Sequence, residues 1–288
     1  MDLVQLLFNG IAVGSVIALS AVGLTLTYGI LRLSNFAHGD FMTLGAYLTW
    51  QANVLGVNIW LSMGLGAVGT VAAMLLSEQV LWKPMRDRRA SSTTLIIISI
   101  GLALFLRSGI LLIWGSDNKT FDLPVAQALD FGGVKVAFYR VIVIALTIVA
   151  AIALHLLLKN SKVGKAMRAV ADNLDLARVS GIDVERVVLW TWILTGILTA
   201  LSGSLYGLIT VVRPNMGWFL ILPLFASVIL GGIGNPYGAI FGALVIGVAQ
   251  ELSVAVPFLG SEYKIAIALV MMIFILFVRP QGLFRGTI

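Results

Sequence analysis

The sequence predicts an all-α polytopic integral membrane protein, from two observations of composition and one of pattern. Of the 288 residues, 59% are hydrophobic and 11% are charged, and the mean hydropathy is +1.02, whereas soluble domains carry about 25% charged residues. Uncharged stretches of about 20 residues, long enough to cross a bilayer as helix, recur along the chain. Backbone in lipid must satisfy its own hydrogen bonds, so these stretches are expected to be helices of one transmembrane domain over residues 1–288.

The apolar stretches predict about eight to nine transmembrane helices. In chain order they lie near residues 3–29, 41–58, 61–82, 93–114, 139–158, 187–212, 218–231, 238–256 and 263–278. Several are short or interrupted by glycine, which predicts broken helices and leaves two counts open: nine spans, or eight full spans with a discontinuous one. The sequence GLGAVG (64–69) matches a dinucleotide-binding pattern, but it lies inside the third span with no strand before it, so it indicates helix packing.

The distribution of basic residues predicts the orientation. Thirteen of the 19 Lys and Arg residues fall on one predicted side, at Arg32, in segments 83–89 and 159–186, and after Val278. Five fall on the other side: Lys119, Lys135, Arg140, Arg213 and Lys264. Cytoplasmic loops collect basic residues, so we expect the N-terminus outside and the C-terminus in the cytoplasm. The same rule accounts for the net charge of +6 without a nucleic-acid partner.

An internal repeat is visible when the sequence is offset by 178 positions without gaps. Eight residues then align with identical residues 178 positions later: Tyr28, Gly29, Gly39, Phe41, Leu44, Gly56, Gly64 and Gly69. The span before Tyr28 is expected to run inward and that before Tyr206 outward, so the repeat has inverted topology. We expect halves of about 3–114 and 187–278, joined through a cytoplasmic loop at 159–186. Many transporters place the substrate between two such halves.

The sequence offers no catalytic or metal-binding constellation. It contains no Walker A motif, so this chain is not expected to bind ATP by such a loop. His38 and His155 lie 117 positions apart and form no metal motif of familiar spacing. Ser34, His38 and Asp40 are close in sequence, which is no evidence for the geometry of a catalytic triad. We therefore expect neither an enzyme nor a bound cofactor or metal.

Segment 163–182 has the pattern of an amphipathic helix in a cytoplasmic loop. Its apolar residues recur at helical spacing and form one stripe: Val163, Ala166, Met167, Val170, Leu174 and Ala177. Lys165, Arg168, Asp172 and Asp175 lie on other faces, and Gly181 is placed to end the helix. Such a helix either lies on the membrane surface or inserts its stripe into a groove of a partner. We favour docking on a partner.

Four stretches resemble the branched-chain amino-acid permease family of ABC importers, the LivH type. They are GLTLTYGILRLSNFAHGDFMTLGAY (23–47), GKAMRAVADNLDLARVSGIDVERV (164–187), LGGIGNPYGAIFGALVIG (230–247) and FVRPQGLF (277–284). The resemblance implies a permease in the plasma (inner) membrane of a prokaryote. It would work with a second, homologous permease, two cytoplasmic ATPases that bind ATP, and an extracytoplasmic substrate-binding protein.

The resemblance also implies the substrate class and the contact with the ATPases. Branched-chain or other neutral amino acids are expected, with urea or short amides as the alternative; the long N-terminal region usual in urea-type relatives does not precede the first span. The family's coupling segment maps onto 164–182. The residues expected in the contact are Gly164, Ala166, Met167, Arg168, Val170, Asp172, Leu174, Ala177 and Gly181.

The translocation path is expected at the glycine breaks, where helix ends offer partial charges of both signs to a zwitterion. Candidate lining residues are Asn35, His38, Gly39, Gly231, Gly232, Gly234 and Asn235. For the glycines, tight packing alone is the alternative. Segments 31–42 and 210–220 are expected to form the inner and outer mouths, and Arg107 to snorkel to the outer interface. Intramembrane ionisable groups are few, which favours an external energy source over an ATP-independent channel or carrier.

Overall fold

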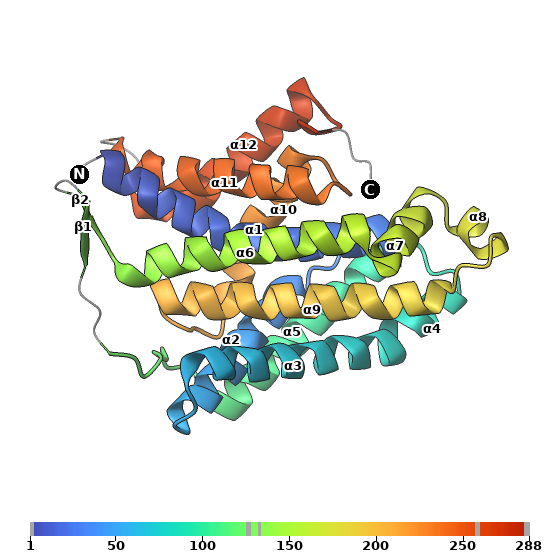
Figure 1. The fold of residues 1–288 in the computed structure, drawn as a ribbon, viewed down its shortest axis with the longest axis horizontal. Helices are drawn as coiled ribbons and strands as arrows, with labels where there is room; N and C mark the ends of the chain where they lie inside the picture. The colour runs from blue at the N-terminus through green and yellow to red at the C-terminus, as the bar shows by residue number, and fades with distance from the viewer. Residues whose placement is uncertain (1–2, 125–127, 132–133, 257–259, 285–288) are drawn as a thin grey trace.

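The computed structural model describes residues 3–124, 128–131, 134–256 and 260–284, and most of them are helical (Figure 1). In the first half, α1 (Leu3–Leu31), α2 (His38–Val54), α3 (Ile59–Ser77), a π-helical turn (Glu78–Trp82), α4 (Lys83–Asp87) and α5 (Ser92–Trp114) follow one another. A hairpin of β1 (Leu129–Phe131) and β2 (Val134–Val136) then leads to α6 (Phe138–Asn160).

The second half begins with two short helices, α7 (Lys162–Asp172) and α8 (Leu174–Val179). Then come α9 (Val184–Ile209), α10 (Met216–Gly231), α11 (Pro236–Leu252) and α12 (Lys264–Val278), with 3-10 turns at Ser253–Ala255 and Ser261–Tyr263. Among the described residues, seven helical stretches are long and apolar enough to cross a membrane. The predicted all-α polytopic class is confirmed, and each of the nine predicted spans corresponds to a helix, although α2 and α10 are short.

Helix α2 is short because the chain before it re-enters the bundle without helical structure. After α1 ends at Leu31, Arg32 takes a left-handed conformation with φ of 53°, and residues 32–35 are not helical. His38 at the start of α2 lies 2.9 Å from the carbonyl oxygen of Ser20, measured from Nε2. Ser20 is 11 residues before the end of α1, or about 16 Å along the helix axis. The N-terminus of α2 therefore lies deep inside the bundle.

Helix α10 begins at a similar depth, because its first turn packs directly on that of α2. A Cβ atom added at Gly39 or at Gly217 would collide with the backbone carbonyl of the other residue. The N–H group of Gly217 also donates to Oγ1 of Thr43 at 3.0 Å. Segments 31–42 and 210–220 therefore both lead inward, and their inner ends touch. That they form the inner and outer mouths of one pathway stays a prediction.

The inverted repeat is confirmed by the helices that correspond under the offset. Helices α2 and α10 begin 178 positions apart, as Gly39 and Gly217 do. Gly56 and Gly234, which the offset pairs, have φ of 89° and 90°. Helices α1 and α9 run in opposite directions (Figure 1), and α1 packs on α11 as α9 packs on α3.

The basic segments expected in the cytoplasm gather at one end of the bundle. Helices α4, α7 and α8 lie together there, away from the β-hairpin (Figure 1). The N–H of Arg32 Nη2 donates to the carbonyl of Ala171 in α7 at 3.4 Å. Arg285, counted with this side, lies outside the described residues.

Candidate functional site

The first-half candidate residues lie where α2 enters the bundle. Asn35 and His38 are fully buried. Nε2 of His38 lies 3.2 Å from Oγ1 of Thr199 in α9, so His38 contacts both long central helices. Within the described part of the chain, Nδ2 of Asn35 and Nδ1 of His38 have no hydrogen-bond partner.

The second-half candidates lie elsewhere, in the turn between α10 and α11. Gly231 contacts the backbone of Gly238, and Gly232, with φ of 106°, packs on the carbonyl of Phe284. The N–H of Gly234 donates to Oγ1 of Thr25 at 3.0 Å. Oδ1 of Asn235 accepts the N–H groups at positions 237 and 238 and so caps α11.

The structure separates Gly39 of the first set from Gly231 of the second, although His38 and Gly234 both contact α1, at Ser20 and at Thr25. Gly217, which touches Gly39, and Gly231 are 14 residues apart in α10, which is about 21 Å along a helix. Gly231, Gly232 and Gly234 thus shape a close turn at the end of α10, and their packing explains why glycine stands there. The central meeting point of α2 and α10 contains only the first set.

A charged cluster at this central point was missed by the sequence reasoning. Nε and Nη2 of Arg107 in α5 donate to the two carboxylate oxygens of Asp40, each at 3.1 Å. The guanidinium carbon also lies 4.7 Å from the ring centroid of Trp218. Asp40 and Trp218 stand in the first turns of α2 and α10, so Arg107 joins the two helix N-termini.

The expectation that Arg107 snorkels to the outer interface is corrected by this pairing. Its side chain is 17% exposed and that of Asp40 is 1% exposed. A charge inside a bilayer is costly unless it is paired, and the pair with Asp40 supplies the compensation. Arg107 is an ionisable residue within an apolar span, which is a sequence signal for such a site. Its partner, Asp40, is 67 positions away and could not be predicted from sequence spacing.

The predicted coupling segment folds as α7 and α8, separated by Asn173. The side chain of Ser161 accepts the N–H of Gly164 and caps α7, and that of Asn173 accepts the N–H of Leu176 and caps α8. Gly181 has φ of 85° and follows α8, as expected for a helix end.

Most of the apolar stripe of this segment faces the chain's own helices, and Leu174 is its exposed member. Gly164, Met167, Val170 and Ala177 are buried, while Ala166 and Arg168 are partly buried and Arg168 donates to the carbonyl of Leu158. Met167 and Val170 are therefore not available to insert into a groove of a partner, contrary to expectation. Asp172, Leu174 and Gly181 are exposed. The segment also exposes Leu176 and Val179, by 62% and 81%.

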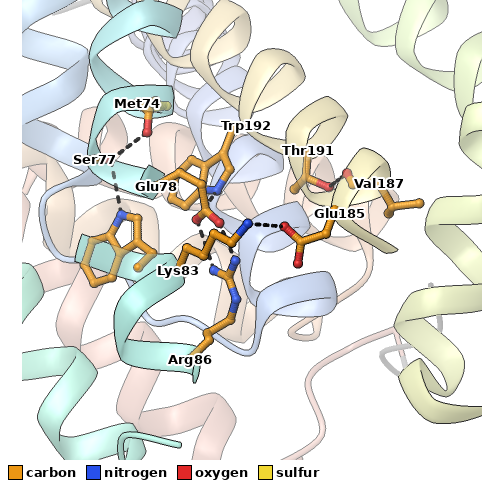
Figure 2. Close-up of polar contacts among 10 residues, drawn as sticks. Met74, Ser77, Glu78, Lys83, Arg86, Glu185, Val187, Thr191 and Trp192 are labelled. Atoms are coloured by element: carbon orange, nitrogen blue, oxygen red, sulfur yellow. Dashed lines mark hydrogen bonds and ion pairs between the residues drawn. The ribbon is translucent and has the colours of Figure 1, made fainter. Parts of the chain in front are cut away.

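A second polar cluster joins α9 to the π-helical turn and to α4 (Figure 2). The buried carboxylate of Glu78 accepts a hydrogen bond from Nε1 of Trp192 at 2.7 Å and is paired with Arg86. Nζ of Lys83 lies 3.2 Å from the carboxylate of Glu185 at the start of α9. π-Helical turns are rare and frequently occur at functional sites. Because α9 follows α8 directly, this cluster links the coupling segment to α3.

Replacing Trp192 with Phe is expected to destabilise the protein by about 1–3 kcal/mol, because Glu78 loses a donor while its carboxylate stays buried. Thermal unfolding of the purified protein measures this effect. Trp190→Phe is the matched control, since Trp190 is an exposed tryptophan of the same helix. Equal unfolding temperatures of the two variants would contradict the role given to the Trp192–Glu78 contact.

Comparison with known proteins agrees with this architecture. The model of a family described as the permease component of branched-chain amino acid transport systems matches residues 6–276. The high-affinity branched-chain amino acid transport system permease protein LivH of Salmonella typhimurium is 31% identical over 97% of this chain and 94% of its own. The corresponding permease BraD of Pseudomonas aeruginosa is 30% identical over the same shares.

A solved structure has a similar fold. PsaBC from Streptococcus pneumoniae, determined in complex with a Fab, superposes with a TM-score of 0.52 at 15% identity, covering 98% of this chain and 93% of the other. At this identity the likeness concerns the fold alone.

Proposed function

The chain belongs to the family of branched-chain amino acid transport permeases, and from this premise we propose that it carries branched-chain or other neutral amino acids into the cytoplasm. It is a permease component of an ABC transporter. Its proposed partners are a second homologous permease, two ATPases and an extracytoplasmic binding protein. Its proposed location is a prokaryotic inner membrane, with the N-terminus outside.

The observation that carries the proposal is the meeting of two helix N-termini deep inside the bundle. A helix N-terminus holds a partial positive charge and free N–H groups, which suit an anionic substrate group. Transporters use such broken helices near the bilayer midplane to hold substrates. An amino acid needs such a polar site for its charged groups and apolar surroundings for its side chain.

Contact with the ATPases is assigned to the exposed face of α8. Leu176 and Val179 are large apolar side chains on a cytoplasmic loop, flanked by the exposed Arg178. Exposed apolar residues of this kind commonly mark protein–protein contacts. Met167 and Val170, buried on the chain's own helices, would make the segment move as one body with α9 when an ATPase pushes on α8. The Glu78 cluster would pass this motion to α3.

Uptake by the reconstituted complex tests the substrate class. Liposomes containing this chain, its partner permease and the ATPases, supplied with the binding protein, are expected to accumulate labelled leucine, isoleucine or valine. Urea and acetamide serve as competitors from the alternative class and are expected to leave the uptake unchanged. Accumulation of urea without that of any amino acid would overturn the substrate assignment.

A further inference from the structure

We propose that Arg107 is a binding residue for the α-carboxylate of the transported amino acid, with an apolar wall on α5 and α10 beside it for the side chain. This inference rests on the proposed function and deepens it. The observations that carry it are the hydrogen-bonding geometry of Arg107, its exposure, its depth and its neighbours.

The hydrogen-bonding geometry leaves one edge of the guanidinium group available. Asp40 accepts from Nε and Nη2, which is the side edge of the group. A guanidinium has five N–H donors, so three remain, and two of them, one on Nη1 and one on Nη2, lie on the end edge of the group. This edge matches the two oxygens of a second carboxylate in bidentate geometry. Asp40 and Trp218 fix the orientation of the group, one by hydrogen bonds and the other by stacking.

The depth of Arg107 argues that this edge does not face lipid. Arg107 is seven residues before the end of α5 at Trp114, about 10 Å from that end, and it is paired with Asp40, which is buried in the first turn of α2. Unsatisfied N–H groups in hydrocarbon are costly, and ionisable residues at such depth usually face a water-filled path or a ligand. The exposed part of Arg107 is therefore assigned to the translocation path.

The neighbours of Arg107 suit an apolar side chain. Leu104 and Leu111 lie three residues before and four after it, which places them on the same face of α5. On α10, Trp218 and Leu222 are likewise four residues apart. All four are exposed large hydrophobic residues. An arginine edge beside such a wall has the chemistry to hold the carboxylate of leucine, isoleucine or valine while the side chain contacts the leucines.

The double variant Arg107→Gln/Asp40→Asn tests the site in the complete reconstituted complex. It replaces both charged groups with neutral amides, so no unpaired charge is left buried. We expect ATP hydrolysis stimulated by the liganded binding protein to stay within about twofold of wild type. Amino acid uptake per ATP should fall by about tenfold or more, the scale of a lost charge-assisted hydrogen bond. Asp40→Asn alone, which keeps Arg107, should lose less uptake than Arg107→Gln alone.

Other outcomes of this test overturn the inference. If Arg107 and Asp40 served stability alone, the double variant would restore wild-type uptake, and either single variant would lower hydrolysis and uptake in proportion. Arg140→Gln is the control for loss of an arginine, because Arg140, in the first turn of α6, contacts the neutral side chain of Asn9 in α1. If wild type itself takes up no amino acid, the proposed function fails rather than this site.

Thiol labelling gives a second test that keeps Arg107 and Asp40 intact. The chain has no cysteine, so Leu222→Cys introduces a single thiol on the proposed wall. A charged methanethiosulfonate reagent should label it in the complex, and saturating liganded binding protein with ATP should slow the labelling at least about threefold. Val149→Cys on α6, an exposed apolar position on another helix, should stay unlabelled. If neither the Leu222→Cys thiol nor the Val149→Cys thiol were labelled, the assignment of the apolar wall to the translocation path would be overturned.

Discussion

Gly39→Val is expected to abolish transport and to reduce the yield of folded protein severely. The added side chain would meet the backbone of Gly217, with the carbonyl carbon 2.8 Å from the new Cβ. Overpacking in a close-packed interior costs about 1–3 kcal/mol and occasionally more. Here the new atoms meet backbone, so no change of side-chain rotamer can relieve the collision. Gly217→Val should have the same effect, because the contact is reciprocal. Thermal unfolding and uptake by the complex measure the loss.

Gly64→Ala provides the control for this prediction. Gly64 lies in α3 with no atom near the position of an added Cβ, so alanine should leave stability unchanged or raise it by about 0.5–1 kcal/mol. A Gly39→Val protein as stable and active as Gly64→Ala would show that α2 and α10 do not meet as described.

The double variant Leu176→Asp/Val179→Asp is expected to uncouple the permease from its ATPases. Burial of one such side chain in an interface is worth about 1.5–3 kcal/mol, which corresponds to about tenfold to a hundredfold in affinity for each residue. Both residues are exposed in the chain itself, so its own unfolding temperature should stay unchanged. Co-purification of the ATPases and ATP-driven uptake should both be lost.

Met167→Ala serves as the contrasting variant. Met167 is fully buried in the same segment, and its truncation should destabilise the permease by about 2–5 kcal/mol. If the α8 variant retained its ATPases and its uptake, the contact would have to lie elsewhere on the chain. A lowered unfolding temperature of that variant would likewise contradict the exposed placement of the two residues.

The helical architecture was readable from sequence because a bilayer permits few alternatives. All nine predicted spans correspond to helices, and the offset of 178 paired Gly39 with the glycine that it touches, Gly217. The re-entrant course of residues 32–37 could not be read in this way. A polar stretch between two apolar spans looks like a surface loop, and its contacts with Ser20 and Thr199 depend on how distant helices pack.

The details of the site depended even more on tertiary structure. The stripe on α7 was predicted at the correct spacing, but periodicity does not indicate whether a helix packs on its own chain or on a partner. The pairing of Asp40 with Arg107 joins residues 67 positions apart in two different helices. A single sequence contains no spacing signal for such a pair.

The proposed function requires that this chain form a membrane path whose transport is driven by ATP hydrolysis on other subunits. The most direct measurement is leucine uptake into liposomes that hold the full complex with trapped ATP, beside liposomes that hold this chain and its partner permease alone. We expect accumulation against a gradient in the first case, its loss with a non-hydrolysable ATP analogue, and no flux in the second. Leucine flux through the permeases alone, at a rate independent of ATP, would contradict it.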